Sequence, residues 1–553
     1  TKPETKDGGQ AAIESTGTGL IFIYNVWQAE ECIAGKFLRL HSRKPVMSEE
    51  DATRARNIAV RIKGMKPLGE GQEKAVVMAL RFGAFILLGG PGTGKSTVQR
   101  AVFCALGLPE VVAARALAER KNTDDDDPLP QRYRDRDEDN NEASSPVLAT
   151  CPTGKGAVAL SKSSGVPATT TQRAIGQRKG GTYAFNEKRK LQVSTLAMDE
   201  FSFSDLEILY RTFCALLDDA SFLGIGDTNQ LPSVGAGNVL QDIKKSGLVP
   251  MAVLDKPFRT SSDSGIPTVV ERIKNGEYPF REGENLKGCT HVNVTDSMAM
   301  AEVLAIVTEK IVREGLSPDS DVIVMSPMRN GELGTFNINA AIKVAINPNT
   351  NGPDTHGFDL AEGGKFLTIN DVVMNLENNT EIKVMNGEVG NVVGFAEVPK
   401  LDDDGQETDE IITTPVIDFG SGPIIYPPDS LNKLVANNAN TVHKYQGSQN
   451  QIAIMVLPKH AAHMTTYNLL LTGFSRACSW SFVVGEPKQI MEAVRRREER
   501  QTGLSQKLRS KIPALVAAMA DYPEYLTYLQ ENALYLEAEN AREAEVKERV
   551  KSA

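Results

Sequence analysis

The stretch ILLGGPGTGKSTVQR, residues 86–100, decides the fold of the first half of the chain. The apolar run 85–88 predicts a buried strand, because it is short and ends at glycines. These glycines permit backbone angles at which successive N–H groups point inward at an anion. Lys95 would reach the outer phosphates and Ser96 would offer its hydroxyl to Mg²⁺, at the positive end of a helix. The complete GxxxxGKS pattern predicts a nucleoside triphosphate site; the alternative is a chance glycine turn.

Composition places the chain among ordinary globular proteins. Its 553 residues predict roughly three or four domains, and 41% hydrophobic with 24% charged residues are typical of a soluble protein. No apolar run has the length of a membrane span, and the polar start TKPETKDGGQ has no signal-peptide pattern. The six cysteines are scattered without a CxxC pair, which suits a reducing compartment and argues against structural zinc. We therefore expect a cytoplasmic protein without a membrane partner.

The net charge of −10 is concentrated in two segments. Residues 119–142 contain ten acidic and five basic residues, and residues 401–410 contain six acidic and no basic ones. The rest of the chain therefore carries about +1. Both segments are rich in Asp, Asn, Pro and Gly, which predicts solvated loops or disorder. The global charge consequently does not exclude a nucleic-acid partner.

The pattern of apolar runs predicts two α/β domains. Strand-like runs separated by helical segments indicate parallel sheets with right-handed crossovers, and a nucleotide site at the carboxyl ends of the strands. Short strands and turns such as MNGEVG, residues 385–390, indicate a small β-barrel inserted into the second domain. The predicted strands are 85–88, 147–150, 194–198 and 221–225 in the first domain and 322–325, 452–456 and 480–484 in the second. The predicted divisions are a flexible tail with a helical N-terminal unit (1–66), a first α/β domain (67–258), a second α/β domain in two parts (259–362 and 437–504), the inserted barrel (363–436) and a charged helical C-terminal tail (505–553).

Two further stretches place polar groups at the ends of predicted strands. In LAMDEFS, residues 196–202, Asp199 would hold Mg²⁺ and Glu200 would orient and deprotonate the attacking water, because phosphoryl transfer needs both. In FLGIGDTNQLPSVGAGN, residues 222–238, the uncharged Gln230 could contact both the γ-phosphate and that water. The alternatives are a helix N-cap with an acidic first turn for the first stretch and plain turn formation for the second.

Seven motifs occur in a recognisable order: GGPGTGKST (89–97), CPTGKGAVAL (151–160), MDEFS (198–202), GDTNQLPSVGAGN (226–238), LDKPFRT (254–260), TVHKYQGSQ (441–449) and LLTGFSRA (470–477). This set resembles the superfamily 1 DNA helicases, and most of all their RecD-like branch. The likeness covers residues 60–505 and extends to SPMRNGELGTFNIN and NGEVG. It implies two RecA-like P-loop domains with parallel sheets, a small helical N-terminal unit and an inserted SH3-like β-barrel. It also implies ATP-driven movement in the 5′-to-3′ direction on single-stranded DNA, with separation of forked duplex DNA.

The resemblance extends the nucleotide site beyond the residues already named. Gln72, in GEGQEKAV, would recognise the adenine edge, while Gln446 and Gly447 would couple the sites for DNA and nucleotide, with Gly447 counted among the nucleotide-binding residues. Arg259, from the linker, and Arg476, from the second domain, would act as arginine fingers; either could instead be a surface arginine. Hydrolysis would then depend on closure of the cleft between the domains. The phosphate-loop residues implied to contact ATP are Gly90, Pro91, Gly92, Thr93, Gly94, Lys95, Ser96 and Thr97.

The resemblance also implies a set of DNA contacts. Small hydroxyls, backbone amides and a few lysines suit a grip on phosphates that ignores base sequence and is renewed at every step. The segment QRKGGTYAFNEKRK, residues 177–190, has a Gly-Gly turn and would split the duplex; the alternative is a plain exposed hairpin. The inserted barrel would help to hold the strand. The implied DNA contacts, each of which could instead be a helix cap near the ATP site, are Thr153, Lys155, Thr441, His443 and Lys444.

The chain departs from the family pattern in places. It has MDEFS where the family usually has VDEAS, and TGFSRA in place of TALTRA, so the packing beside the catalytic residues differs. The acidic insertion 119–142 is longer than the family predicts. It is either a regulatory tether that binds a protein partner or a neutral loop, and the C-terminal tail is a second candidate for partner binding.

Two classes of function stay open at this point. The first is a DNA-stimulated ATPase that translocates and unwinds, and the intact set of Lys95, Glu200, Gln230 and Arg476 favours it. The second is an ATP-switched DNA-binding subunit of a larger recombination, replication or defence complex. An unrelated phosphate-loop enzyme, such as a small-molecule kinase, does not account for the ordered downstream motifs. Because no clustered carboxylates occur outside the ATP site, we do not expect strand cleavage.

Overall fold

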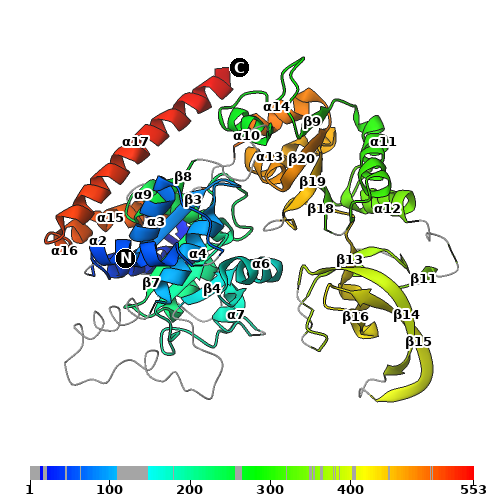
Figure 1. Ribbon diagram of the computed structural model, residues 1–553, viewed down its shortest axis with the longest axis horizontal. Helices are drawn as coiled ribbons and strands as arrows, with labels where there is room; N and C mark the ends of the chain where they lie inside the picture. The colour runs from blue at the N-terminus through cyan, green and yellow to red at the C-terminus, as the bar shows by residue number, and fades with distance from the viewer. Residues whose placement is uncertain are drawn as a thin grey trace. The chain divides into compact units, whose positions relative to one another are not determined.

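The chain folds as two compact units (Figure 1). The first comprises the described parts of residues 1–152, 156–259 and 499–552, and the second those of residues 153–155 and 260–498. The computed structural model describes residues 13–15, 21–43, 46–62, 64–108, 147–178, 180–255, 264–318, 320–347, 352, 355–361, 365–377, 379, 381–384, 386–401, 406–445, 449–497, 500 and 502–552. The acidic insertion 119–142 lies outside the described residues.

A six-stranded parallel sheet forms the centre of the first unit, in the order β5-β4-β6-β7-β3-β8. Strands β3 and β7 are buried along their whole length, as expected for a parallel sheet covered on both faces. The predicted first parallel sheet is therefore confirmed. Its strands are β3 (Ala84–Gly89), β4 (Val147–Cys151), β5 (Ala168–Thr170), β6 (Thr195–Met198), β7 (Ser221–Gly226) and β8 (Met251–Leu254).

Helices surround this sheet, and the N-terminal ones belong to its core. Helix α1 buries Ile33, Phe37 and Leu40, and the Phe37 ring meets the rings of Phe213 and Phe222 edge to face at 4.9 and 5.8 Å. The helices are α1 (Tyr24–His41), α2 (Glu49–Ala59), α3 (Glu70–Arg81), α4 (Lys95–Leu106), α6 (Gly154–Ser164), α7 (Thr171–Ala174), α8 (Leu206–Ala215) and α9 (Val239–Ser246), with the short 3-10 helix η2 (Phe201–Phe203) and a strand pair β1 (Ile13–Ser15) and β2 (Ile21–Ile23) before α1.

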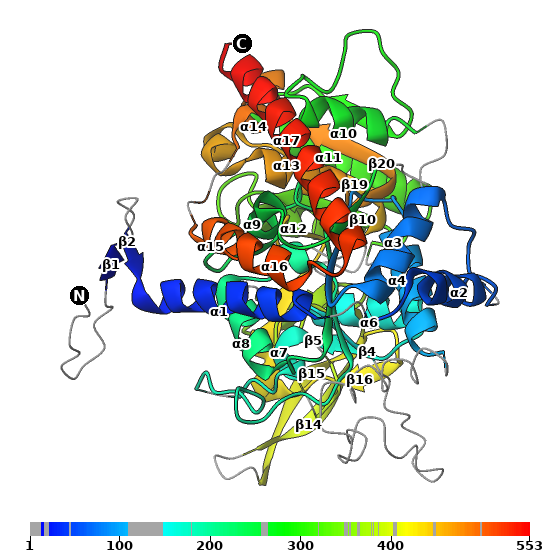
Figure 2. The ribbon, with the colours of Figure 1, turned by 90° about the vertical axis from the view of Figure 1, so that its left-hand side faces the viewer.

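The C-terminal segment is helical, as predicted for 505–553, but it is no free tail. Figure 2 shows α15 and α16 alongside α1. Leu504, Leu508, Leu515 and Met519 are buried and join the core of the first unit. The chain thus returns to the first unit after completing the second. These helices are α15 (Leu504–Ser510), α16 (Ile512–Ala518) and α17 (Pro523–Ser552).

The second unit contains a five-stranded parallel sheet in the order β18-β10-β19-β20-β9. The strands predicted at 322–325, 452–456 and 480–484 all lie in it, so the second parallel sheet is confirmed as well. Its strands are β9 (Cys289–Val292), β10 (Val322–Ser326), β18 (Ala439–Thr441), β19 (Asn450–Val456) and β20 (Ala477–Val484). Its helices are α10 (Ile266–Lys274), α11 (Asp296–Val307), the π-helix η3 (Thr308–Arg313), α12 (Thr335–Ile346), the 3-10 helix η6 (Lys459–Met464), α13 (Tyr467–Phe474) and α14 (Pro487–Arg495).

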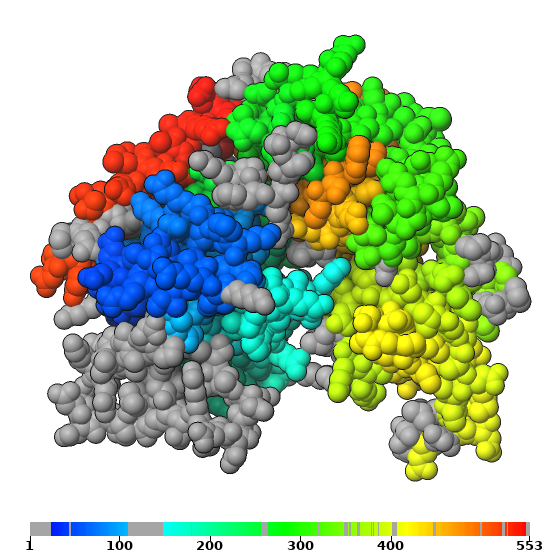
Figure 3. All heavy atoms as spheres, in the orientation of Figure 1, coloured from blue at the N-terminus to red at the C-terminus, as the bar shows by residue number. Residues whose placement is uncertain are grey.

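An antiparallel sheet is inserted between α12 and β18, yellow in Figure 3. Its order is β16-β15-β14-β13-β17, and closure into an SH3-like barrel stays a prediction. The acidic run 401–410 is not a loop throughout, because Glu407 opens β15 and pairs with Leu401 of β14. The strands of this sheet are β13 (Val372–Asn375), β14 (Val389–Leu401), β15 (Glu407–Asp418), β16 (Pro423–Ile425) and β17 (Leu434–Ala436), with the 3-10 helix η5 (Pro428–Lys433). A separate antiparallel pair, β11 (Thr355–Gly357) and β12 (Phe366–Thr368), precedes it.

Candidate nucleotide site

The phosphate loop joins the carboxyl end of β3 to the start of α4. Gly92 and Gly94 have φ angles of 75° and 86°, in the left-handed region that glycine adopts without a steric penalty. The hydroxyl of Thr93 donates to the carbonyl of Gly90 at 2.9 Å. A β-carbon on Gly89 would lie 2.5 Å from the Thr93 hydroxyl, so only glycine fits there. The loop therefore has the tight backbone course that the sequence predicts.

Lys95 begins α4 and lies against this loop. Its ammonium donates to the carbonyls of Gly89 at 2.5 Å and Gly90 at 3.1 Å. Ser96 and Thr97 follow in the first turn and are partly exposed. The free N–H groups of a first helical turn, together with the positive end of the helix dipole, favour an anion at this end of α4.

Gln72 of α3 makes a contact that its motif does not reveal. Its side-chain oxygen accepts from the backbone N–H of Gly69 at 2.9 Å, which caps α3. Its amide nitrogen donates to the carbonyl of Thr93 at 3.1 Å, and the side chain is 4% exposed. Gln72 therefore ties the start of α3 to the phosphate loop. Its predicted contact with adenine stays a prediction.

Asp199 and Glu200 follow β6, beside β4 and β7. The backbone N–H of Asp199 donates to the carbonyl of Thr150 at 2.8 Å, and one Asp199 oxygen accepts from the N–H of Glu200 at 2.9 Å. Glu200 has a φ of 49°, a left-handed conformation that costs a non-glycine residue about 1–2 kcal/mol. Strain of this kind gathers at sites where a side chain must point in a fixed direction.

The pKa of Asp199 is raised to about 7, mainly because the carboxylate is buried. The neighbouring charge of Glu200 raises this pKa further, while the bond from the Glu200 N–H and the charge of Lys95 lower it. The influence of Lys95 indicates that the carboxylate and the phosphate-loop ammonium share one region. A divalent cation at this place would favour the ionised carboxylate.

Gln230 lies in the loop after β7 and is buried, as is Asp227. Asp227 does act as a turn former, because its carboxylate accepts from the N–H of Asn229 at 2.9 Å and its carbonyl accepts from the N–H of Gln230 at 3.2 Å. Strands β6, β7 and β3 are neighbours in a parallel sheet. The carboxylates, Gln230 and the phosphate loop therefore lie at the carboxyl ends of three adjacent strands, where ligands bind in such folds.

The donor set fits Mg²⁺ bound together with a triphosphate. This ion is usually held by one or two carboxylates plus substrate phosphates and water, which Asp199 and the Ser96 hydroxyl could complement. Among the described residues, no group of three or more His, Cys, Asp or Glu could hold a metal by itself.

No helix in the described part of the chain combines the length and apolarity required to span a membrane.

Arg476 belongs to the second unit and follows α13. It is 2% exposed, and its Nε donates to the carbonyl of Thr472 at 3.1 Å, while its Nη2 donates to the Ser475 hydroxyl at 2.9 Å. The guanidinium is thus held against the end of its own helix. Arg259, Gln446 and Gly447 lie outside the described residues.

The residues predicted to contact DNA lie at two strand ends. Thr153 is exposed and Lys155 half-buried, both next to the start of α6. Thr441 ends β18, and a turn follows in which the N–H of Lys444 donates to the Thr441 carbonyl at 3.0 Å. His443, in the same turn, is exposed. Their role stays a prediction.

The segment 177–190 does contain the predicted Gly-Gly turn. Gly180 and Gly181 have φ angles of 86° and 74°, and Gln177 and Tyr183 form an antiparallel bridge. Its described residues contain this single bridge and no longer strand pairing. The N–H of Arg178 donates to the carbonyl of Thr182 at 2.8 Å and the N–H of Ala184 to that of Gly176 at 2.9 Å, so a short hairpin surrounds the turn.

Comparison with known proteins places these features in a family. Residues 67–296 match the model of an AAA domain, and residues 438–484 match that of a UvrD-like helicase C-terminal domain. The chain is 27% identical over 503 residues to the ATP-dependent RecD2 DNA helicase of Deinococcus radiodurans, covering 90% of this chain and 60% of that protein. It is 24% identical over 523 residues to the RecBCD enzyme subunit RecD of Mycobacterium tuberculosis, covering 89% of this chain and 80% of that one. Among solved structures, the Pif1 helicase from Candida albicans is 16% identical, with a TM-score of 0.42 over 77% of this chain and 97% of that chain.

The AAA match lies mostly in the first unit and extends past residue 259 into the second, whereas the UvrD-like match lies within the second unit. The AAA match contains the whole first parallel sheet, and the UvrD-like match contains β18, β19 and β20 of the second. The two parallel sheets are accordingly the cores of two RecA-like domains. With its motifs in family order along both domains, the chain is a RecD-like member of the superfamily 1 helicases.

Proposed function

We propose that the chain is an ATP-dependent DNA helicase that moves 5′-to-3′ on single-stranded DNA and opens forked duplex DNA. The observation that carries this proposal is the placement of the phosphate loop, the β6 carboxylates and Gln230 at one edge of the first sheet. The likeness to the Deinococcus radiodurans protein, an ATP-dependent DNA helicase, supports it. Since this chain spans 60% of that relative's length, the activity of the whole relative is a proposal here.

Each residue of the proposed site has a task in hydrolysis. The phosphate-loop N–H groups and Lys95 bind the triphosphate, and Ser96 with Asp199 would hold Mg²⁺, which when bound would neutralise charge on the phosphates. Glu200 accepts the proton of the attacking water, and its fixed left-handed backbone directs the carboxylate. Gln230 orients that water. In this proposal the residues accelerate hydrolysis by orienting the attacking water and by stabilising the negative charge of the phosphates.

Arg259 and Arg476 are proposed as arginine fingers that stabilise charge on the transferring phosphoryl group. A cation supplied by the second domain makes hydrolysis depend on both domains. That dependence would convert the ATP cycle into movement along DNA, gripped by residues of CPTGKG and TVHKYQGS. The inserted sheet would help to hold the strand, and the basic segment 177–190 would separate the duplex.

A second candidate function is an ATP-switched DNA-binding subunit with little unwinding of its own. The observation that favours it is the likeness to RecD proteins, which are subunits of the RecBCD enzyme. The two candidates differ in what the isolated chain does, because only a self-sufficient helicase opens a fork without partners.

ATP hydrolysis and fork unwinding by the purified chain test the proposal. We expect single-stranded DNA to stimulate hydrolysis and a fork with a 5′ tail to be opened, whereas a fork with a 3′ tail stays closed. Lys95→Ala should abolish both activities, since it removes the cation that binds the outer phosphates. Stimulated hydrolysis without unwinding of either fork would favour the subunit, and preference for a 3′ tail would refute the proposed direction.

A further inference from the structure

The basic segment 177–190 contrasts with the acidic chain that carries it. It contains five basic residues and one acidic residue, in a protein of net charge −10. Arg178, Lys188 and Arg189 are exposed. An exposed cluster of this kind attracts the phosphates of nucleic acid, but separation of a duplex also requires that the segment keep its position under load.

The segment is held on one side by the C-terminal end of helix α8. The ammonium of Lys190 donates to the carbonyl of Cys214 at 2.7 Å, and the backbone N–H of Leu191 donates to the carbonyl of Ala215 at 2.8 Å. The thiol of Cys214 also donates to a carboxylate oxygen of Glu187 at 3.5 Å. Buried Ile175, Leu191 and Ala215 form a small apolar cluster at the same place, with Tyr183 and Phe185 packed on it.

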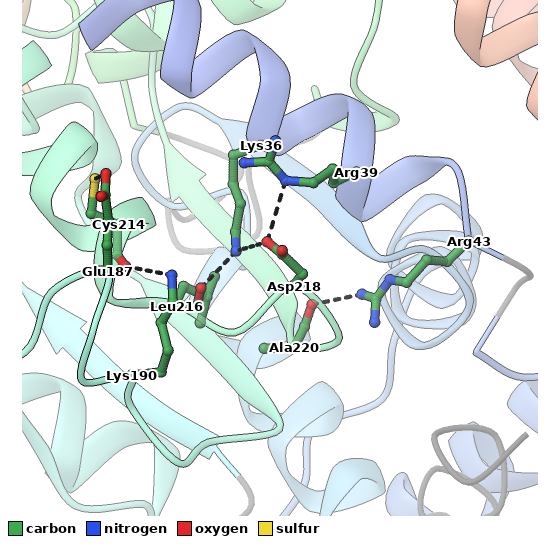
Figure 4. A network of polar contacts seen from close by, with 9 residues as sticks. All are labelled: Lys36, Arg39, Arg43, Glu187, Lys190, Cys214, Leu216, Asp218 and Ala220. Carbon is green, nitrogen blue, oxygen red and sulfur yellow. Dashed lines mark hydrogen bonds and ion pairs between the residues drawn. The ribbon is translucent and has the colours of Figure 1, made fainter. Parts of the chain in front are cut away.

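Helix α1 holds the same helix end from the other side (Figure 4). The ammonium of Lys36 donates to the carbonyl of Leu216 and to a carboxylate oxygen of Asp218, both at 2.6 Å. Arg39 contacts the same oxygen at 3.3 Å, and Arg43 donates to the carbonyl of Ala220 at 2.7 Å. Three cations of one helix and its C-terminal extension thus contact the turn 216–220, and Lys36 is the buried one.

The two lysines perform a common task at the end of α8. The last carbonyls of a helix have no partner within it and lie at the negative end of the helix dipole. Lys190 and Lys36 satisfy two of them, at Cys214 and Leu216. Helix α8 is therefore the element that joins α1 to the segment.

Of the two lysines, Lys36 is the more deeply buried, so its charge costs more free energy to remove from water. It is 1% exposed, and burial lowers its pKa, while Asp218 opposes the shift and the charge of Lys190 adds to it. An apolar side chain would fill the same space without desolvating a charge. Unlike an apolar side chain, the ammonium fixes the position of the turn, because it donates to both the Leu216 carbonyl and the Asp218 carboxylate.

Helix α1 is itself anchored to the segment that returns from the second unit. The N–H of Gly503 donates to Glu30 at 2.9 Å, and the ammonium of Lys507 lies 3.0 Å from the other Glu30 oxygen. Lys511 pairs with Glu31. One helix thus connects the return of the chain with the base of the basic segment.

We propose that Lys36 is a positioning residue for duplex separation, acting from α1 through the end of α8 on the segment 177–190. This inference rests on the proposed helicase function. Lys36 touches neither nucleotide nor DNA in this scheme, so its loss changes how many base pairs open for each ATP and leaves the hydrolytic cycle on single-stranded DNA intact.

Lys36→Met tests the inference, because it keeps the length of the side chain and removes its donors. We expect the rate of fork unwinding per ATP hydrolysed to fall on the order of ten-fold, since small misplacements of a working group have effects of this size or larger. The rate of hydrolysis on single-stranded DNA should stay within about two-fold of wild type. Trypsin should cleave within 177–190 faster than in the wild-type protein.

Two further variants sharpen the result. Arg39→Met is the matched control, because Arg39 contacts the same Asp218 oxygen but is 52% exposed, and it should change neither readout. Lys190→Met removes the second ammonium from the end of α8 and should reproduce the loss, with the double variant no worse than either single one. It also serves if Lys36→Met fails to fold.

Unwinding per ATP at the wild-type level in both lysine variants would overturn the inference and leave the helicase proposal standing. A parallel fall of hydrolysis and unwinding would overturn it too, because it would indicate general damage. Wild-type protein that hydrolyses ATP on single-stranded DNA but opens no fork would overturn the proposed function and this inference with it.

Discussion

Asp242 of α9 is a buried carboxylate outside the nucleotide site, and its ionisation should set how stability changes with pH. It is 5% exposed. One oxygen accepts from the hydroxyl of Thr502 at 2.7 Å, and the other is buried without a hydrogen-bond partner among the described residues. Burial raises its pKa from 3.8 to about 6, with the bond from Thr502 opposing the shift and the charge of Glu30 adding to it.

The direction of the effect follows from proton binding. Because the pKa is higher in the folded state, the folded chain keeps this proton while the unfolded chain releases it. The free energy of unfolding therefore falls as pH rises from about 4 to about 6 and then levels off. A shift of about two pH units corresponds to about 3 kcal/mol in total, of which about 1.4 kcal/mol is lost between pH 5 and pH 7.5.

Asp242→Asn removes this titration and keeps an oxygen for the Thr502 hydroxyl. In differential scanning calorimetry, the melting temperature of the first unit in Asp242→Asn, relative to wild type, should rise by about 2–3 °C as the pH is raised from 5 to 7.5. The exposed Asp521→Asn serves as the control and should track wild type throughout. A difference between Asp242→Asn and wild type that stays constant over this range, or that narrows as pH rises, would refute the reasoning.

Three further substitutions probe the nucleotide site and the core. Glu200→Gln should still bind ATP, but turnover should fall by about 10²–10⁴-fold for want of a proton acceptor; normal DNA-stimulated turnover would remove this assignment. Gln72→Ala should lower kcat/KM for all four nucleoside triphosphates alike if the tie to Thr93 dominates, and for ATP alone if adenine recognition does. Leu508→Ala should cost about 2–5 kcal/mol through an internal cavity, measured by thermal unfolding, whereas the exposed Val516→Ala should cost little.

The sequence predicts most of what lies at the centre of each sheet. Buried strands such as β3 and β19 are continuous apolar runs, so periodicity and flanking glycines locate them. Strand β5 escapes prediction, because it has three residues of the sequence ATT and is defined by pairing with β4 and not by its composition. The position of the candidate nucleotide site at the strand ends is predictable for the same reason, since its residues follow the central strands directly along the chain.

The C-terminal segment shows where local patterns lose their power. Leu504, Leu508 and Leu515 recur at helical spacing, which indicates a helix with one apolar face. The spacing does not say which surface covers that face. The charged residues between them predict a solvated tail, yet Lys507 and Lys511 pair with α1. The leucine pattern indicates burial, but the helix that covers this face lies more than 470 positions earlier in the chain, as the bond from Gly503 to Glu30 shows.

The same limit applies with more force to helix α1, because its decisive contacts are made by charges. A buried Glu30 or Lys36 is an exception to the rule that charged residues stay in water, and it becomes understandable only beside Gly503, Lys507 or Leu216. No motif of the family lies on this helix. The motifs therefore indicate the groups proposed to hydrolyse ATP, but they do not indicate the charges of α1, because only the tertiary structure brings these charges beside their partners.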